Sequence, residues 1–307
     1  MRRRIAILFT SLLLGTLSLS SPAQAQEEEE MMQRKQKENA KTAVKAKKGT
    51  KATVKKGTKT KPKTKGKTLS LDEIIRRTNQ TAYYQGKDGR AKVTMTIRSK
   101  SGSKRVRQFT VLRRNADKGE DQSFYLYFHK PADVSKMVFI ARKHVNSEDE
   151  RWLYLPGLDL VKRIGASDER TSFVGSDVFY EDVSGRNPAA DNHKLVKSSK
   201  NYYVIESTPK KPDSVEFTSY KMWVHRGSFL PTKIEFYDKK GAAYRVMTVE
   251  SVDTIQGFST ATKATVRSLR SGTSTTIEYS NVEYNVGLPA KVFGQRYLRR
   301  APQKYLK

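Results

Sequence analysis

The sequence predicts a mainly β (α+β) fold, in which a single large antiparallel sheet curls and leaves a concave apolar face for helices to cover. Three observations lead to this fold class. After residue 68, about eleven or more short segments have strand patterning and are bounded by turn residues. Only one long segment has helical periodicity. Strands and helices do not alternate along the chain, which excludes a parallel α/β sheet.

The helical segment covers residues 71–84. Ser70 and Glu73 form a capping-box pattern at its start, with Ser70 as the N-cap. Leu71, Ile74, Ile75 and Thr78 then recur on one face. We expect Gly86 to mark the end of the helix region.

The strands follow from period-two alternation and from short polar breakers. Between residues 91 and 98, Ala91, Val93, Met95 and Ile97 alternate with polar residues, and a Ser-Gly-Ser turn leads to the return strand of a hairpin. The predicted strands are 91–98, 106–113, 124–129, 137–142, 152–155, 160–164, 194–198, 202–207, 215–225, 230–237, 244–252, 261–268 and 275–284.

One segment, residues 171–185, interrupts this rhythm and is interpreted as a short helix or an irregular lid. Asp177, Glu181 and Asp182 lie in it at spacings that allow two carboxylates to share a helix face. Two interpretations follow: a site for a hard cation, or ion pairs with nearby arginines. The second is the simpler one, because arginines flank the segment on both sides.

The N-terminus has the order of a secretory signal peptide. Arg2, Arg3 and Arg4 precede an apolar run, residues 5–19, and an Ala-x-Ala cleavage pattern ends at Ala25. The alternative, a membrane anchor, needs about 20 apolar residues, and this run is shorter. We therefore expect residues 1–25 to be a cleaved signal peptide and the mature chain to be exported to a bacterial periplasm.

A lysine-rich linker, residues 26–67, follows. Residues 34–67 hold 15 of the basic residues and one acid, with no aromatic side chain, so that the linker is expected to be disordered. Residues 33–67 would attract a polyanion or an anionic membrane by counterion release. Alternatively, they form only a solubilising linker. Export argues against chromosomal DNA, so no specific nucleic acid is expected as a partner.

Composition excludes several kinds of chemistry. The chain of 307 residues has no cysteine and a net charge of +29, and residues 68–307 retain 42 basic and 26 acidic residues, a charge of +16. No phosphate-binding glycine pattern or nucleophile elbow is present, and the four histidines lack metal-ligand spacing. We expect no enzyme activity, no cofactor and no metal site. Residues 68–307 are long enough to bury one core.

Large apolar side chains exceed what a sheet with one covering helix needs. Most of them must form the core, but an excess on a concave face can also enclose acyl chains, since each buried CH₂ contributes about 0.8 kcal/mol. We expect the lipid-contacting residues to be Val93, Met95, Ile97, Phe109, Leu126, Phe128, Trp152, Tyr154, Phe173, Phe179, Trp223 and Phe236.

Five segments together resemble the bacterial outer membrane lipoprotein-sorting protein family of the LolA/LolB superfamily. They are residues 176–186 (SDVFYEDVSGR), 193–195 (HKL), 203–209 (YVIESTP), 230–238 (LPTKIEFYD) and 284–289 (YNVGLP). The resemblance covers about residues 69–300. The lysine-rich linker departs from the short N-terminus usual in the family.

The resemblance implies an incomplete barrel closed by helices over an apolar cavity. It also implies a periplasmic carrier that takes the acyl chains of a lipoprotein or lipid toward the outer membrane, with an inner-membrane exporter of the resistance-nodulation-division type and an outer-membrane acceptor as partners. Residues of the first segment are expected to form a lid or partner-facing loop: Asp177, Tyr180, Glu181, Asp182, Gly185 and Arg186. Arg186 would pair with Glu181 or Asp182 as a latch, or would hold a fixed structural corner.

Overall fold

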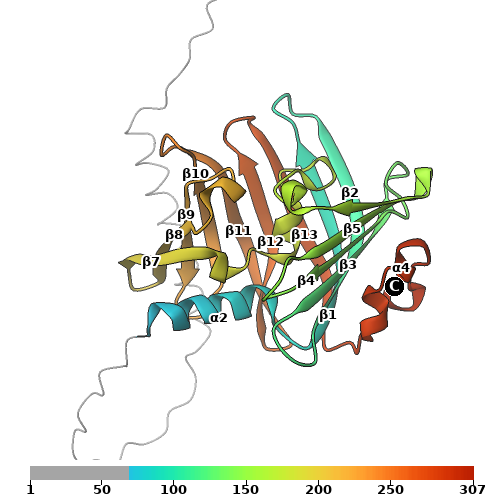
Figure 1. Cartoon of the computed structure of the whole chain (residues 1–307), viewed down its shortest axis with the longest axis horizontal. Helices are drawn as coiled ribbons and strands as arrows, with labels where there is room; N and C mark the ends of the chain where they lie inside the picture. Colours follow the sequence, from blue (N-terminus) through green and yellow to red (C-terminus); the bar gives the residue numbers. More distant parts are fainter. Residues whose placement is uncertain (1–68) are drawn as a thin grey trace, which may run out of the picture. The chain divides into compact units, whose positions relative to one another are not determined.

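The computed structural model describes residues 69–307, and these form one antiparallel sheet of 13 strands (Figure 1). The strands are β1 (Asp88–Arg98), β2 (Lys104–Asn115), β3 (Gln122–Lys130), β4 (Val138–Lys143), β5 (Glu150–Leu155), β6 (Leu160–Ile164), β7 (Asp191–Ser198), β8 (Tyr202–Pro209), β9 (Ser219–His225), β10 (Pro231–Tyr237), β11 (Ala243–Ile255), β12 (Phe258–Ser268) and β13 (Thr273–Tyr284). The predicted antiparallel sheet is confirmed.

The strand order explains why the sheet has two free edges. It is β6-β5-β4-β3-β2-β1-β13-β12-β11-β10-β9-β8-β7, so that β1 and β13 pair in the middle and β6 and β7 are the edges. The chain passes from one edge to the other through residues 165–190, here named the connector. The sheet is therefore an incomplete barrel, as the resemblance implied.

Strand alternation defines an inner face, the face that carries Val93, Met95 and Phe139. These side chains belong to a cluster built from β1–β6, Val266 of β12 and connector residues that include Phe173 and Tyr180. The connector contains the short helices η2 (Ala166–Asp168), η3 (Phe173–Gly175), α3 (Tyr180–Ser184) and η4 (Pro188–Ala190). Residues 171–185 thus contain two short helices, η3 and α3, joined by irregular backbone, and their role as a lid stays a prediction.

Helix α2 (Leu71–Tyr83) packs against the other half of the sheet. Ile74 is buried against Ile205 and Val224 of β8 and β9, because the apolar residues of the helix recur on one face. Ser70 caps the helix by accepting a hydrogen bond from the Glu73 N–H at 3.2 Å. Only this half of the predicted capping box forms, since the Glu73 carboxylate instead pairs with two arginines of the next turn.

The outer face of β2–β5 is covered by the end of the chain, which sequence patterning did not predict. This segment contains the short helices η6 (Ala290–Phe293), α4 (Arg296–Arg299) and η7 (Gln303–Tyr305), and α4 lies beside β3 and β4 (Figure 1). Phe293 and Leu298 pack against Tyr125 and Ile140. Strands β4 and β5 are therefore buried on both faces. No helix within residues 69–307 is long and apolar enough to span a membrane.

One predicted strand is shorter in the structure. Residues 215–225 were expected to form a single strand, but β9 begins only at Ser219. The helix η5 (Pro212–Ser214) precedes it, and Phe217 packs in a separate aromatic cluster with Tyr220 and Phe236. A buried phenylalanine at this bend satisfies the apolar pattern without any strand pairing.

Candidate functional site

An apolar cavity of about 350 Å³ lies on the inner face. Its floor comes from β1–β3 and β10–β13, and its cover comes from the end of α2 and from the connector. Apolar side chains of the floor include Val93, Phe109, Leu126, Val266 and Ile277. The cavity therefore lies between the two halves of the sheet, where β1 pairs with β13.

Buried ion pairs hold the connector in place. Glu181 is buried and binds Arg186 at 3.0 Å and Arg170 at 2.5 Å. Arg186 also binds Asp191 at the start of β7, at 2.9 Å, and Arg170 binds Glu216 at 2.6 Å. Burial acts to lower the pKa of Arg170, but its hydrogen bonds to Glu216 and the charge of Glu181 outweigh burial and raise that pKa. The pairs tie the connector to both β7 and the loop before β9.

Two phenylalanine rings lie between three arginine side chains, and we name this row of contacts the arginine ladder. In order it contains Arg245 of β11, Phe179, Arg170, Phe217 and Arg186. The guanidinium carbons of Arg245 and Arg170 lie 4.2 Å and 5.0 Å from the centroid of the Phe179 ring. Arg170 and Arg186 lie 5.0 Å and 5.3 Å from the centroid of the Phe217 ring. Cation–π attraction is strongest where water is excluded, so the ladder reinforces the buried ion pairs.

Replacing Phe179 with leucine is expected to lower the free energy of unfolding by about 2 kcal/mol, because two cation–π contacts are lost while most of the apolar volume remains. Chemical denaturation measures the change. Phe258→Leu is the matched control, since the Phe258 ring packs on Tyr284 at 4.8 Å and no cation lies over it among residues 69–307. Equal effects of the two changes would contradict a stabilising role for the ladder.

The remaining acids of the connector have partners of their own. Asp182 pairs with Arg245 of β11. Asp177 accepts hydrogen bonds from the hydroxyls of Thr273 and Thr275, the latter at 2.8 Å. Within residues 69–307, no group of three or more His, Asp or Glu side chains is arranged to hold a metal ion. The acids thus fasten the connector to β11 and β13, which accords with the ion-pair interpretation.

Gly185 ends α3 at a position that no other residue fits. Its φ angle is +76°, and a Cβ atom there would lie 2.6 Å and 2.7 Å from the two Cε atoms of the Tyr83 ring of α2. The buried Lys143 ammonium donates hydrogen bonds to the carbonyl oxygens of Ser184 and Gly185, at 3.1 Å and 2.9 Å. Burial lowers the pKa of Lys143. The end of α3 is therefore fixed from two sides.

Comparison with known proteins places this arrangement in a family. A family model described as "Uncharacterized protein" matches residues 120–300. The chain belongs to this family. A comparison with curated proteins finds no match.

Several solved structures share this fold. A DUF1329 family protein from Desulfovibrio piger has a TM-score of 0.68 at 27% identity, covering 73% of this chain and 96% of its own. A putative outer membrane lipoprotein-sorting protein domain from Vibrio parahaemolyticus has a TM-score of 0.69 at 25% identity, covering 74% and 97%. A LolA superfamily protein from Nitrosomonas europaea has a TM-score of 0.59 at 20% identity, covering 75% and 100%. The resemblance to outer membrane lipoprotein-sorting proteins is confirmed, and the chain has the fold of a LolA superfamily protein.

Five of the residues predicted to contact lipid line the cavity of the LolA-like sheet: Val93, Met95, Phe109, Leu126 and Phe173. Ile97 and Phe128 do not line it but belong to the apolar cluster beside it. Strand alternation placed the members on β1–β3 on one face, and the structure brings them together with Phe173 of the connector. A role in lipid contact stays a prediction for all of them.

Five other predicted contacts lie away from the cavity. Trp152 and Tyr154 belong to the outer-face cluster beneath the C-terminal helices, so the inward orientation expected for them is wrong. Phe179 lies in the arginine ladder. Trp223 lies beneath the Lys233 ammonium, 4.8 Å from the ring centroid, and Phe236 belongs to the aromatic cluster of β9–β11.

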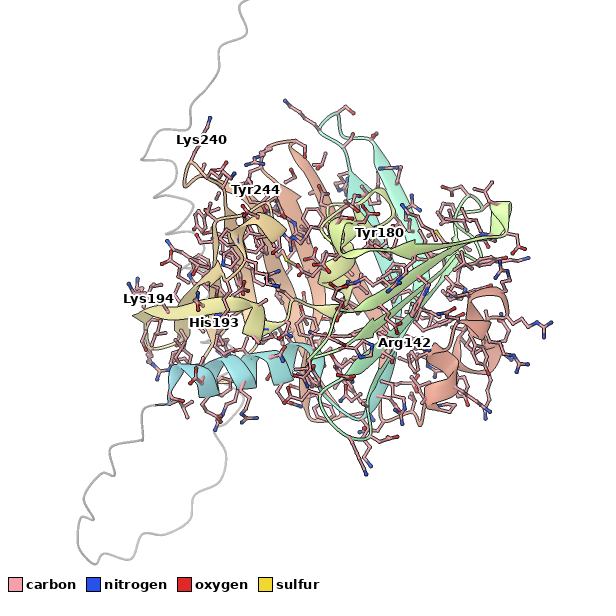
Figure 2. The ribbon with its side chains drawn as sticks, in the orientation of Figure 1. Arg142, Tyr180, His193, Lys194, Lys240 and Tyr244 are labelled. Carbon is pink, nitrogen blue, oxygen red and sulfur yellow. The ribbon has the colours of Figure 1, made fainter. Side chains whose placement is uncertain are left out.

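The predicted lid residues all lie in the connector, where Figure 2 shows Tyr180 in front of the sheet. The Tyr180 ring packs on Phe139 and Phe173, with ring centroids 5.4 Å apart in both cases. Arg186 pairs with Glu181, one of its two predicted partners, whereas the other, Asp182, pairs with Arg245. Phe173 and Tyr180 of the connector thus face the apolar inner face of the sheet, whereas Glu181 and Asp182 form ion pairs with arginines.

Sequence reasoning missed much of the cavity wall. Tyr83, Met247, Ala264, Ile277 and Tyr279 line it as well. Alternation in β13 would have placed Ile277 and Tyr279 on one face. A small residue such as Ala264 gives no such signal, because its contribution is the space that it leaves open.

Proposed function

We propose that this protein is a carrier that binds an acyl chain of a lipid or lipoprotein in the inner-face cavity. The observation that carries this proposal is the apolar cavity itself, covered by α2 and the connector. Its volume of about 350 Å³ falls in the range of about 300–1,000 Å³ that is typical of ligand pockets. The lipoprotein-sorting description of the Vibrio parahaemolyticus relative supports the same role.

The energetics suit a carrier that needs no catalytic group. Transfer of a sixteen-carbon chain from water to an apolar cavity is favourable by about 12 kcal/mol before the entropy of association is subtracted. Binding of this size holds a chain during diffusion but remains reversible. We therefore assign the protein a binding role rather than an enzymatic one.

The test is the identification of lipid in protein purified without detergent. Native mass spectrometry should show a lipid adduct, and solvent extraction should release that lipid for analysis. A fluorescent fatty acid should bind the delipidated protein and be displaced by the extracted lipid. Protein that is always free of lipid and that binds no fluorescent fatty acid would overturn the proposal.

The arginine ladder favours a second candidate, a non-carrier adaptor of an envelope complex. A connector held by buried ion pairs resists opening, as a permanently closed adaptor would. The cavity weighs against this candidate, because an adaptor has no need of open apolar space. Lipid extraction separates the two, since an adaptor would release none.

We place the carrier in the periplasm, with residues 1–25 as a cleaved signal peptide and residues 68–307 as the carrier domain. An inner-membrane exporter of the resistance-nodulation-division type would supply the lipid, and an outer-membrane acceptor would receive it. The signal peptide and the linker of residues 26–67 lie outside the described residues. N-terminal sequencing of the mature protein would test the cleavage site after Ala25.

The lysine-rich residues 33–67 are proposed to bring the carrier to anionic membranes. Deletion of these residues should abolish most binding to anionic vesicles at low salt, because each basic residue near the surface contributes about 1 kcal/mol and salt screens it. Uptake of fluorescent fatty acid should not change. Vesicle sedimentation measures the first effect. A deletion variant that keeps its salt-sensitive vesicle binding would assign the interaction to the folded domain.

A further inference from the structure

Arg113 is the one charged residue of the cavity wall, among residues 69–307, that has no opposite charge within 4 Å. The others are each neutralised: Arg90 pairs with Glu283 at 2.7 Å, Lys233 pairs with Glu235 at 2.6 Å, and Asp182 pairs with Arg245. Arg113 is therefore the one charged residue of the cavity wall, within the described part of the chain, that forms no ion pair by contact.

The guanidinium of Arg113 is held in position by neutral groups. It lies on the inner face because Phe109, Val111 and Arg113 alternate with outward residues along β2, and all three line the cavity. It donates to the Asn115 side-chain oxygen at 2.6 Å and to the Gln85 carbonyl oxygen. A guanidinium has five N–H donors, so three remain for a ligand.

Burial lowers the pKa of Arg113 by more than the charge of Asp88 raises it, which is the direction expected for a cation that has lost water and makes no ion pair by contact. An arginine side chain nevertheless stays protonated in proteins. A partly buried charge of this kind is unfavourable until an anion with matching hydrogen bonds compensates it. A ligand anion beside Arg113 would therefore be stabilised.

Polar groups gather around Arg113 at one end of the cavity. Gly89 of β1 pairs with Arg113 on one side and with Tyr284 on the other. The Tyr284 hydroxyl lies 2.9 Å from the Thr260 hydroxyl, and both residues line the cavity. Further along β1 the wall becomes apolar at Val93 and Met95, so that about 20 Å of strand separates Gly89 from Met95. The cavity has a polar end and an apolar body.

We propose that the cargo is a single-chain amphiphile with a carboxylate head group, a long-chain fatty acid, whose carboxylate binds the Arg113 guanidinium. This inference rests on the proposed carrier function and names its substrate class. A planar guanidinium matches a carboxylate with two parallel hydrogen bonds. One guanidinium without a contacting carboxylate matches one carboxylate, and a cavity of about 350 Å³ suits one chain rather than the several chains of a lipoprotein.

The experiment compares hexadecanoate with its methyl ester, which has the same chain without the charge. Calorimetric titration of the delipidated mature protein at pH 8 should show hexadecanoate binding about 10- to 100-fold more tightly than the ester, the difference expected for hydrogen bonds to a charged group. Arg113→Gln should remove this preference and leave binding of the ester unchanged. Arg113→Lys, which keeps the charge without the planar fork, should retain part of it.

Arg107→Gln is the matched control. Arg107 lies on the same face of β2 and also has no carboxylate within 4 Å among residues 69–307, but it does not line the cavity. The preference for hexadecanoate should survive this change. Thermal unfolding of each variant shows whether it is folded, and the comparison of acid and ester on the parent protein tests the proposal without any variant.

The outcomes separate the inference from the function on which it rests. Equal binding of hexadecanoate and methyl ester by the parent would overturn the head-group assignment and leave the carrier role standing. Tighter binding of hexadecyl phosphate than of hexadecanoate would replace the carboxylate with a phosphate. Failure of all three compounds to bind would overturn the carrier function itself.

Discussion

Gly185→Ala is expected to lower the free energy of unfolding by about 3 kcal/mol or more. Two effects add. Gly185 has φ +76° and ψ 146°, a backbone region used almost only by glycine, and a non-glycine residue there is strained by about 1–3 kcal/mol. The new methyl group would also lie 2.6 Å and 2.7 Å from the Cε atoms of the Tyr83 ring, and overpacking of this kind costs about 1–3 kcal/mol. Urea denaturation monitored by circular dichroism measures the sum.

Gly241→Ala measures the cost of a positive φ angle without a steric contact. Gly241 has a φ of +73°, and an alanine methyl group at this position would have no atom within 4 Å, so its substitution should cost only about 1–2 kcal/mol. A second comparison introduces Gly185→Ala into a Tyr83→Ser background, where the steric part should disappear. Equal losses at the two glycines would show that contact with Tyr83 is unimportant.

Alternation along β1 predicts the orientation of its side chains because polar residues separate the apolar ones. Val93, Met95 and Ile97 are buried on the inner face, as this pattern indicates. The pairing of β1 with β13 brings Ile277 to the same wall. That pairing joins distant segments and leaves no local mark in the sequence.

In β4 and β5 the same reasoning fails because both faces are buried. Phe139 faces the connector, whereas Ile140 and Trp152 face the C-terminal helices. A continuous run of apolar residues does not show which side chains face which side of the sheet. The helices that cover Trp152 are short and lack helical periodicity, so the sequence offered no reason to expect a second covered face.

Some ion pairs of the connector could be predicted from the sequence and others could not. Arg186 was expected to pair with Glu181 or Asp182, or to hold a structural corner, and it pairs with Glu181, five residues away in the chain. Arg245 lies 63 residues from Asp182, and only the strand order places β11 beside the connector. The sequence shows which residues carry a charge. Which of the many arginines and lysines pairs with a given carboxylate depends on the order of the strands.

Open space in the cavity depends on a small residue at its centre. Ala264 of β12 pairs with Val249 of β11 and Ile277 of β13, and all three line the cavity. A large side chain at position 264 would occupy the volume that we assign to the acyl chain. Because no side chain fills that volume, the substitution need not displace packed neighbours.

Ala264→Trp is expected to weaken fatty-acid binding roughly 100-fold, because exclusion of about four methylenes from the cavity removes about 3 kcal/mol. Stability should be retained, since the indole fills apolar space. Fluorescent fatty-acid titration and thermal unfolding measure the two quantities. Arg267→Trp, at an exposed position on the same strand, controls for the added aromatic ring and should leave binding unchanged. A folded Ala264→Trp protein that binds fatty acid as tightly as its parent would place the acyl chain outside this cavity.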